Sequence, residues 1–232
     1  MRKVVVVSVG ISWERVARAI GRTGIGEGDV VLLFNSIPRV SDAEDAMNRL
    51  DLWLREVYRE VVVEMFWLDP RNGFEENVAL IRRNVERFAP CKAYFLAVGG
   101  FRWLSMAVAY AAFATHTLSH ITNVSVETLE LELEEDTKTR DIIRQIFPTQ
   151  ESRVIRIPIL LKLAEIDYTE LQILKEIATG TKRTKHLVKK LGIPRQTLQR
   201  KLVKLVKKEL LEYEKKGKSY EYIPTDLAKM LL

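Results

Sequence analysis

The 232-residue sequence lacks several features that would point to common classes of protein. It has a single cysteine, Cys91, which excludes a disulfide framework and a cysteine-rich zinc site. Its three histidines, at positions 116, 120 and 186, do not have the spacing of metal ligands. We therefore expect no metal site and a protein suited to a reducing compartment.

Long hydrophobic runs are also missing. The longest mostly apolar stretch, Trp103–Ala114, is shorter than the roughly 18 residues that a membrane span needs. The N-terminal run MRKVVVVSVG is short and leads into a charged helix, so it predicts a first strand rather than a signal peptide. We expect a cytoplasmic protein with no membrane partner.

The fingerprints of common cofactor sites and of catalysis are absent as well. The stretch GRTGIGEG (21–28) does not fit G-x-G-x-x-G, and it follows a helical pattern rather than the first strand. No G-x-x-x-x-G-K-[ST] occurs, which argues against NTP hydrolysis of the Walker type. Since no pair of nucleophile and base is visible either, we expect no cofactor and no enzymatic activity.

Positive charge, in contrast, is abundant near the C-terminus. The net charge of the chain is +6, and from Glu165 onward 16 Lys and Arg face 9 Asp and Glu, whereas the remainder is close to neutral. Between Lys182 and Lys208 the sequence has 11 basic residues and no acidic one. Because a solvated helix face usually mixes both signs, this run indicates a surface that binds a polyanion.

Strand-like and helical patterns alternate through the first two thirds of the chain. Four apolar runs predict buried strands, and helical periods follow them: Lys3–Val9, Asp29–Phe34, Val61–Trp67 and Lys92–Val98 as strands, and Trp13–Arg22, Asp42–Tyr58, Phe74–Phe88 and Phe101–Thr115 as helices. Near-continuous apolar runs are typical of a parallel sheet that is covered on both faces. The alternation predicts an α/β, Rossmann-like, mainly parallel sheet. Two further strands are expected at Val124–Leu133 and Arg153–Leu160, around a helix at Thr137–Phe147.

The pattern changes near residue 162, so we predict two domains, residues 1–161 and 162–232. The second domain reads as three helices, a hairpin and a last helix: Thr169–Gly180, the stretch RTKHLVKKLGI, Arg195–Glu209, a hairpin around Lys216–Gly217, and Thr225–Leu231. This is the layout of a winged helix-turn-helix. Because the third helix of such a domain enters the major groove of DNA, we expect double-stranded DNA as a partner.

The third helix and the hairpin supply the candidate DNA-binding residues. Arginine and glutamine can form bidentate pairs with bases, whereas lysines meet phosphates. The candidates are Arg195, Gln196, Gln199 and Arg200 for bases, and Lys204, Lys207, Lys215, Lys216 and Lys218 for phosphates. The alternative, a winged helix that docks protein, fits an acid-free run poorly. Tyr213, Tyr220 and Tyr222 either stack on bases or pack within the hairpin.

The loops after the four strands are the candidate ligand site, because open parallel sheets bind ligands beyond the carboxyl ends of their strands. Gly99 and Gly100 would let backbone N–H groups approach an anion at the start of a helix. Arg102 adds a guanidinium group for phosphate, Phe101 or Trp103 can stack on a base, and Ser12 either caps the next helix or donates to a phosphate. The alternative for the two glycines is a tight strand–helix turn. Together these residues favour a nucleotide-like ligand.

The stretches VGIS, GGFRWL and LGIPRQTLQRKL occur in an order and spacing that resemble archaeal CRISPR-associated transcription regulators, which join a CARF domain to a winged helix-turn-helix. The resemblance implies a homodimer that binds a cyclic oligoadenylate, often the tetra-adenylate, across its two-fold axis. It implies that ligand binding alters DNA binding at promoters of CRISPR loci. The implied pocket residues are Gly10, Ile11, Ser12, Gly99, Gly100, Phe101 and Arg102.

Two alternatives to this regulator remain open from the sequence. Some CARF domains cleave their ligand, which would make the protein a ring nuclease with an accessory winged helix. The other alternative is a plain dimeric DNA-binding protein whose α/β domain binds no ligand. A DNA reader of this size usually needs two-fold symmetry to span two half-sites about 34 Å apart, so both DNA-binding readings predict a homodimer.

Overall fold

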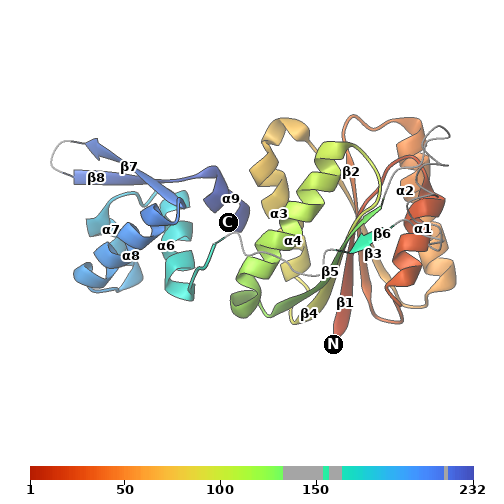
Figure 1. Cartoon of the computed structure of the whole chain (residues 1–232), viewed down its shortest axis with the longest axis horizontal. Helices are drawn as coiled ribbons and strands as arrows, with labels where there is room; N and C mark the ends of the chain where they lie inside the picture. Colours follow the sequence, from red (N-terminus) through yellow and green to blue (C-terminus); the bar gives the residue numbers. More distant parts are fainter. Residues whose placement is uncertain (133–153, 157–163, 217–218) are drawn as a thin grey trace.

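The computed structural model describes residues 1–132, 154–156, 164–216 and 219–232. The chain forms an α/β unit followed by a smaller unit of helices and a hairpin (Figure 1). The predicted helix at 137–147 and the predicted domain boundary at 161/162 lie outside the described residues. In the described part of the chain, no helix combines the length and the apolar character that crossing a membrane requires.

The α/β unit is built on one sheet with the strand order β3-β2-β1-β4-β5-β6. The strands are β1 (Arg2–Ser8), β2 (Val30–Ser36), β3 (Val62–Leu68), β4 (Cys91–Ala97), β5 (Val124–Glu132) and β6 (Val154–Arg156). The first five are parallel, and β6 pairs antiparallel with β5. The predicted Rossmann-like, mainly parallel sheet is therefore confirmed.

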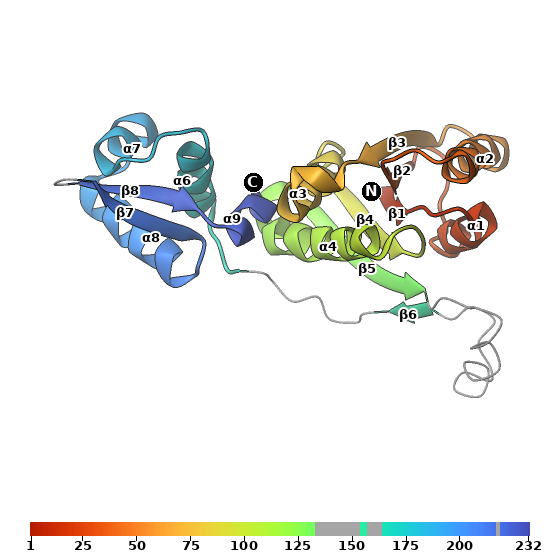
Figure 2. The ribbon, with the colours of Figure 1, turned by 90° about the horizontal axis from the view of Figure 1, so that it is seen from above.

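Four helices cover the two faces of this sheet (Figure 2). They are α1 (Trp13–Arg22) and α2 (Ser41–Val57) on one face, and α3 (Phe74–Glu86) and α4 (Arg102–Thr122) on the other. Along β1, Val5 and Val7 belong to the α1–α2 core, whereas Val4 and Val6 belong to the α3–α4 core. The continuous valine run thus reflects a strand that is buried on both sides, because successive side chains point to opposite faces.

Two elements differ from the sequence prediction in a way that has a physical cause. The prediction of four fully buried strands was wrong for β3, which lies at the edge of the sheet and leaves Val62 and Met65 exposed. Helix α4 continues to Thr122 rather than ending at Thr115. Its polar second half stays helical, and the hydroxyls of Thr115 and Thr122 each donate to the carbonyl four residues earlier.

The C-terminal unit has the predicted element order of a winged helix-turn-helix. It consists of α6 (Tyr168–Ala178), α7 (Thr184–Leu191), α8 (Arg195–Lys207), the antiparallel strands β7 (Leu211–Lys216) and β8 (Ser219–Pro224), and α9 (Asp226–Leu231). Gly192 ends α7 at a φ of 65°, a left-handed conformation that glycine adopts without strain, and this allows the turn into α8. Leu174, Leu187, Leu198 and Leu202 are fully buried between the helices.

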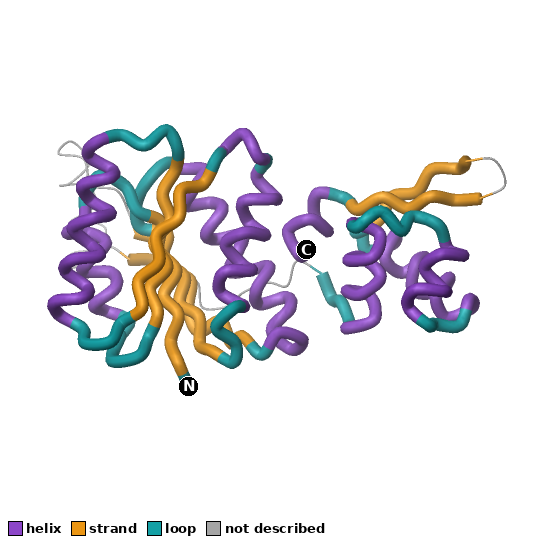
Figure 3. Tube along the Cα trace, turned by 180° about the vertical axis from the view of Figure 1, so that it is seen from behind, coloured by secondary structure: helices purple, strands orange, loops and turns teal. Residues whose placement is uncertain are grey.

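The last helix connects the two units. Helix α9 packs on α3 and α4, and Figure 3 shows the C-terminus between the two parts of the chain. The buried Arg82 of α3 donates from Nε to the Met230 carbonyl at 3.2 Å, and burial lowers the pKa of its guanidinium group. At the far end of α4, His120 Nε2 lies 2.9 Å from the Ile166 carbonyl, just before α6. The second unit is therefore held to the α3–α4 layer through α9 and through the contact of His120 with Ile166.

Candidate functional site

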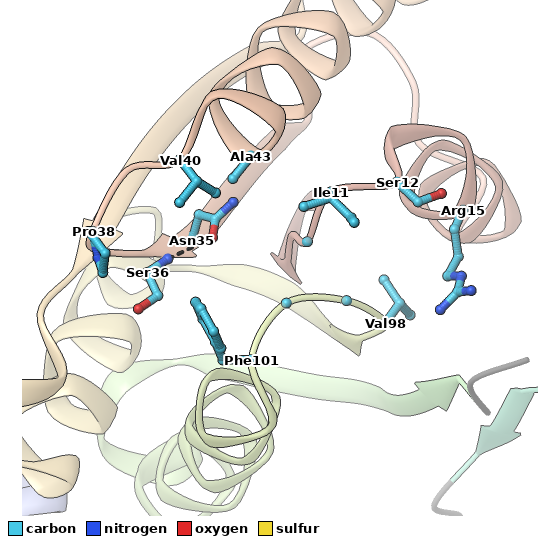
Figure 4. A pocket seen from close by; sticks show the side chains of 13 residues that line it. Ile11, Ser12, Arg15, Asn35, Ser36, Pro38, Val40, Ala43, Val98 and Phe101 are labelled. Atoms are coloured by element: carbon cyan, nitrogen blue, oxygen red, sulfur yellow. Dashed lines mark hydrogen bonds between the residues drawn. The ribbon is translucent and has the colours of Figure 1, made fainter. Parts of the chain in front are cut away.

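A cavity of about 410 Å³ opens at the carboxyl ends of β1, β2 and β4 (Figure 4). The chain places β2 on one side of β1 and β4 on the other, so this is where the order of the strands reverses. Open α/β sheets bind ligands at such a point. The lining residues are Gly10, Ile11, Ser12, Arg15, Asn35, Ser36, Pro38, Val40, Ala43, Val98, Gly99, Gly100 and Phe101.

The glycines in this wall are required by the contact of two loops. A Cβ on Gly10 would lie 2.6 Å from the nitrogen of Gly100, and one on Gly99 would lie 2.9 Å from the nitrogen of Gly10. A Cβ on Gly100 would lie 2.7 Å from the Val9 carbonyl oxygen, and Gly100 also has a φ of +85°. Since no real side chain tolerates such distances, the loops after β1 and β4 pack backbone against backbone only because all three residues are glycine.

The hydroxyl groups of Ser8 and Ser105 hydrogen-bond to the backbone of this pair of loops. The N–H of Gly99 donates to the Oγ of Ser8 at 3.3 Å, and the hydroxyl of Ser105 donates to the Gly99 carbonyl at 3.2 Å. The N–H of Gly99 is thus used inside the fold, which corrects the expectation that both glycines leave their N–H groups for a ligand. The wall of the cavity is fixed by internal contacts before any ligand arrives.

The structure brings six of the seven predicted ligand-binding residues together and leaves one aside. Gly10, Ile11, Ser12, Gly99, Gly100 and Phe101 line the cavity. Arg102 is the first residue of α4; its side chain is exposed and is not part of the lining. Ser12 occupies the N-cap position of α1 but makes no capping hydrogen bond, and its hydroxyl lies 3.4 Å from a Glu14 carboxylate oxygen.

The sequence prediction missed the residues that other elements contribute to this wall. Arg15 follows Ser12 by one helical turn, and that spacing was the available signal. Asn35 ends up in the wall because β2 extends two residues beyond Phe34, into a stretch that was expected to be loop. Its Oδ1 accepts the N–H of Ser36 at 2.7 Å.

The amide nitrogen of Asn35 is the one unexplained polar atom in the lining among the described residues. The residue is 2% exposed, and its Nδ2 has no hydrogen-bond partner among the described residues. A buried donor without a partner is costly, and most buried polar groups in native proteins are hydrogen-bonded to protein or to ordered water. Asn35 therefore places an unpaired amide donor in the wall of the cavity.

The rest of the cavity offers apolar and aromatic surface. Its walls are largely apolar, and Phe101 presents an exposed aromatic ring at the rim. Among the described residues, no group of three or more His, Cys, Asp and Glu is arranged to hold a metal ion. Cys91 is buried at the start of β4, and burial raises the pKa of its thiol to about 11, so it stays protonated near neutral pH. A mostly apolar wall with an aromatic rim is suited to binding a flat molecule.

A second candidate surface lies on α8. Lys201 pairs with Asp167, and Lys208 pairs with Glu170 at 2.7 Å, so both of these lysines are neutralised by the start of α6. The predicted DNA-binding side chains of α8 behave differently: Arg195, Gln196, Gln199, Arg200, Lys204 and Lys207 are all exposed. None of the four cations in this set has an ion pair within the described part of the chain. The cations of α8 therefore fall into two groups: those on one face pair with acidic residues at the start of α6, and the exposed ones have no ion pair among the described residues.

The hairpin contributes less free charge than expected. Lys215 is exposed, whereas Lys216 is 3.1 Å from Glu221, which also pairs with Arg183 at 2.9 Å. These two cations hold the pKa of the Glu221 carboxyl below its usual value. Lys218 lies outside the described residues.

A family described as the Csa3 CRISPR-associated Rossmann-like domain matches residues 3–138. No curated protein matches the chain. Among solved structures it is similar to Enterococcus italicus Csm6 bound to cyclic hexa-2′-fluoro-hexa-dAMP, with 10% identity and a TM-score of 0.44. That similarity covers 90% of this chain and 49% of the other, so this chain spans about half of that protein's length. The family match covers more than half of the sequence, and the chain therefore belongs to the Csa3 CRISPR-associated Rossmann-like domain family.

Proposed function

We propose that the protein is a dimeric transcription regulator of CRISPR loci that binds DNA through α8 and a cyclic oligoadenylate through its Rossmann-like domain. The observation that carries the proposal is the sorting of charge on α8. Arg195, Arg200, Lys204 and Lys207 are exposed and form no ion pair with another described residue, whereas Lys201 and Lys208 are neutralised on the other face. Unpaired cations on one face of a helix attract the phosphates of a duplex.

The cavity of the first unit supports a nucleotide ligand. Phe101 can stack on a base, Arg15 supplies a positive charge, and the Nδ2 of Asn35 can donate to a ring nitrogen or a phosphate oxygen. The family's association with CRISPR and the resemblance to CARF regulators favour a cyclic oligoadenylate, and we take cyclic tetra-adenylate as the first ligand to test. The protein would bind this ligand without cleaving it.

An apolar rim beside the cavity supports a homodimer. Ile11 is 68% exposed, Phe101 54% and Met106 50%, and all three belong to the loops after β1 and β4 or to the start of α4. Exposed apolar side chains that gather in one region commonly mark an interface. A two-fold axis at this rim would place two cavities opposite each other, which suits a ring built of identical nucleotides.

Helix α4 offers a route from the cavity to the DNA-binding unit. Its first residue follows Phe101 in the cavity wall, and its His120 contacts the Ile166 carbonyl just before α6. Helix α9 packs on the same helix. A ligand that prefers one position of the loop after β4 would bias the position of α4, and with it the winged helix. It would do so only through a difference in affinity for the two states.

The test is a calorimetric titration of the purified protein with cyclic tetra-adenylate, followed by chromatography of the mixture. We expect saturable binding with one ring per dimer, loss of binding in Phe101→Ala, and recovery of the intact ring. Linear products would replace the proposal by a ring nuclease. Absence of heat with an intact, folded dimer would favour a plain DNA-binding protein.

A further inference from the structure

A shallow groove of about 360 Å³ separates α8 from the hairpin. Its lining consists of Val203, Val206, Lys207, Tyr213, Tyr220 and Tyr222. The ring of Tyr213 packs edge-on against Tyr220 at 5.4 Å and tilted against Tyr222 at 6.2 Å. The hairpin register places Tyr213 opposite Tyr222. The tyrosines thus form one supported apolar wall, and Val203 on α8 forms the other.

Val203 occupies the centre of the exposed face of α8. It follows Gln199 by four residues and precedes Lys207 by four, and side chains at this spacing lie on the same side of a helix. The valine is 55% exposed. It is an apolar residue on a face where its neighbours are polar or charged. An apolar side chain in this position does not contribute to the core of the domain, to which α8 contributes Leu198, Leu202 and Leu205.

The charges around the groove indicate its occupant. Arg200, Lys204 and Lys207 surround Val203 on α8, and Lys215 lies on the same face of the hairpin as Tyr213. None of these four cations has an ion pair with another described residue. A second copy of the same surface would carry the same charge and be repelled. Duplex DNA has the opposite charge, and it combines anionic strands with apolar groups in its grooves.

We propose that Val203 reads thymine through the 5-methyl group of the base, with Tyr213 and Tyr220 completing the apolar seat. The inference rests on the DNA-binding part of the proposed function. In the major groove each base presents hydrogen-bonding groups, and thymine alone among the four standard bases adds a methyl group. A valine has no donor or acceptor, so this methyl group is the feature that it can distinguish. Arg200 and Gln199 then read the neighbouring positions by hydrogen bonds.

The experiment begins with selection of duplexes from a random pool by the full-length protein. Each thymine of the best-bound duplex is then replaced singly by deoxyuridine, which removes only the methyl group, and affinities are measured by fluorescence anisotropy. At one thymine we expect about fourfold weaker binding by the wild type, the factor that corresponds to about 0.8 kcal/mol for one buried methyl group. Val203→Ala should bind the two duplexes equally.

The variants distinguish loss of methyl recognition from misfolding and from loss of DNA binding. Val203 is exposed, so Val203→Ala is expected to fold normally, and Leu52→Ala on the exposed face of α2 serves as the control that retains the deoxyuridine effect. If wild type binds selected duplexes but no deoxyuridine weakens it, or if Val203→Ala keeps the effect, the inference is overturned while DNA binding stands. If the wild type retains no duplex at all, the DNA-binding proposal fails, and the inference fails with it.

Discussion

The cavity and the exposed face of α8 present their polar groups in opposite ways. In the cavity, the groups that face a ligand are fixed by the fold: three glycines pack two loops together, and Asn35 is held by the N–H of Ser36. On α8, the recognising groups are long exposed side chains without ion pairs in the described part of the chain. Preorganised groups select shape, whereas flexible cations attract a polyanion in a salt-dependent manner. Under the proposed function, the first surface supplies small-molecule selectivity and the second supplies DNA affinity.

The largest expected effect is on the fixed loops of the cavity. In Gly100→Ala the new Cβ would lie 2.7 Å from the Val9 carbonyl at a φ of +85°, so we expect the free energy of unfolding to fall by about 3 kcal/mol or more. Gly28→Ala has a similar φ of +74° with nothing within 4 Å, and should cost only about 1 kcal/mol. Urea unfolding measures both. Equal losses would show that the contact between the loops is not what demands glycine.

The next largest effect is the loss of DNA affinity when exposed lysines of α8 are removed, compared with removal of a paired lysine. The double variant Lys204→Ala, Lys207→Ala should bind duplex DNA about tenfold more weakly, and the slope of log affinity against log salt should fall by about two. Lys201→Ala provides the matched control because this lysine already pairs with Asp167. We expect the control to leave the salt slope unchanged. A similar change of slope in both proteins would contradict the sorting of charge.

An effect of similar size is expected from the donor in the cavity. Asn35→Asp keeps the oxygen that accepts the Ser36 N–H but replaces the Nδ2 donor with an acceptor. Affinity for cyclic tetra-adenylate should fall by about tenfold, as expected for loss of one hydrogen bond to a charged or buried group. Asn84→Asp on α3 makes the same chemical change away from the cavity. Calorimetry that finds both variants equal to wild type would remove Asn35 from the ligand site.

The smallest effect concerns the paired face of α8, where charge serves stability. Asp167 caps α6 by accepting the N–H of Glu170 at 2.9 Å, and it also pairs with Lys201. Burial raises the pKa of its carboxyl, but the bonds from Lys201 and Glu170 outweigh burial and bring the pKa below 3.8. Asp167→Ala should therefore cost about 1 kcal/mol at neutral pH.

The dependence on pH follows from the sign of this shift. A carboxyl whose pKa is lowered by folding stabilises the protein above its unfolded pKa, near 3.8, and loses that effect as the pH falls through the lower folded value. The gap between wild type and Asp167→Ala should thus shrink progressively below about pH 4 in urea unfolding. A gap that does not change with pH would show that the ion pair contributes nothing.

Much of the fold follows from local sequence patterns. The valine and leucine runs predicted a parallel sheet because strands buried on both faces need continuous apolar sequence. The exposed edge strand β3 has a similarly apolar sequence, and its position depends on the order of strands, which no local pattern encodes. Gly192 and the run of leucines at 198, 202 and 205 predicted the turn and the core-facing side of α8.

The candidate site was predictable only in part, because local sequence patterns do not show which distant segments lie side by side. The motif loops around Gly10 and Gly99 were visible in the sequence, but Asn35 enters the wall through the neighbouring strand. The pairing of Lys201 and Lys208 with residues of α6 was equally invisible, because it depends on the packing of two helices. Contacts with distant acidic residues determine which lysines are neutralised and which can still bind a partner. Composition alone gives only the total number of lysines.

The most direct test of the account measures whether the two surfaces communicate. Fluorescence anisotropy would follow binding of a CRISPR promoter fragment at fixed salt, with and without saturating cyclic tetra-adenylate. The account predicts a change in DNA affinity of at least about fivefold, and the same factor in ligand affinity when DNA is saturating, because coupling between two binding sites is reciprocal. Identical DNA affinities with the ligand demonstrably bound would contradict it.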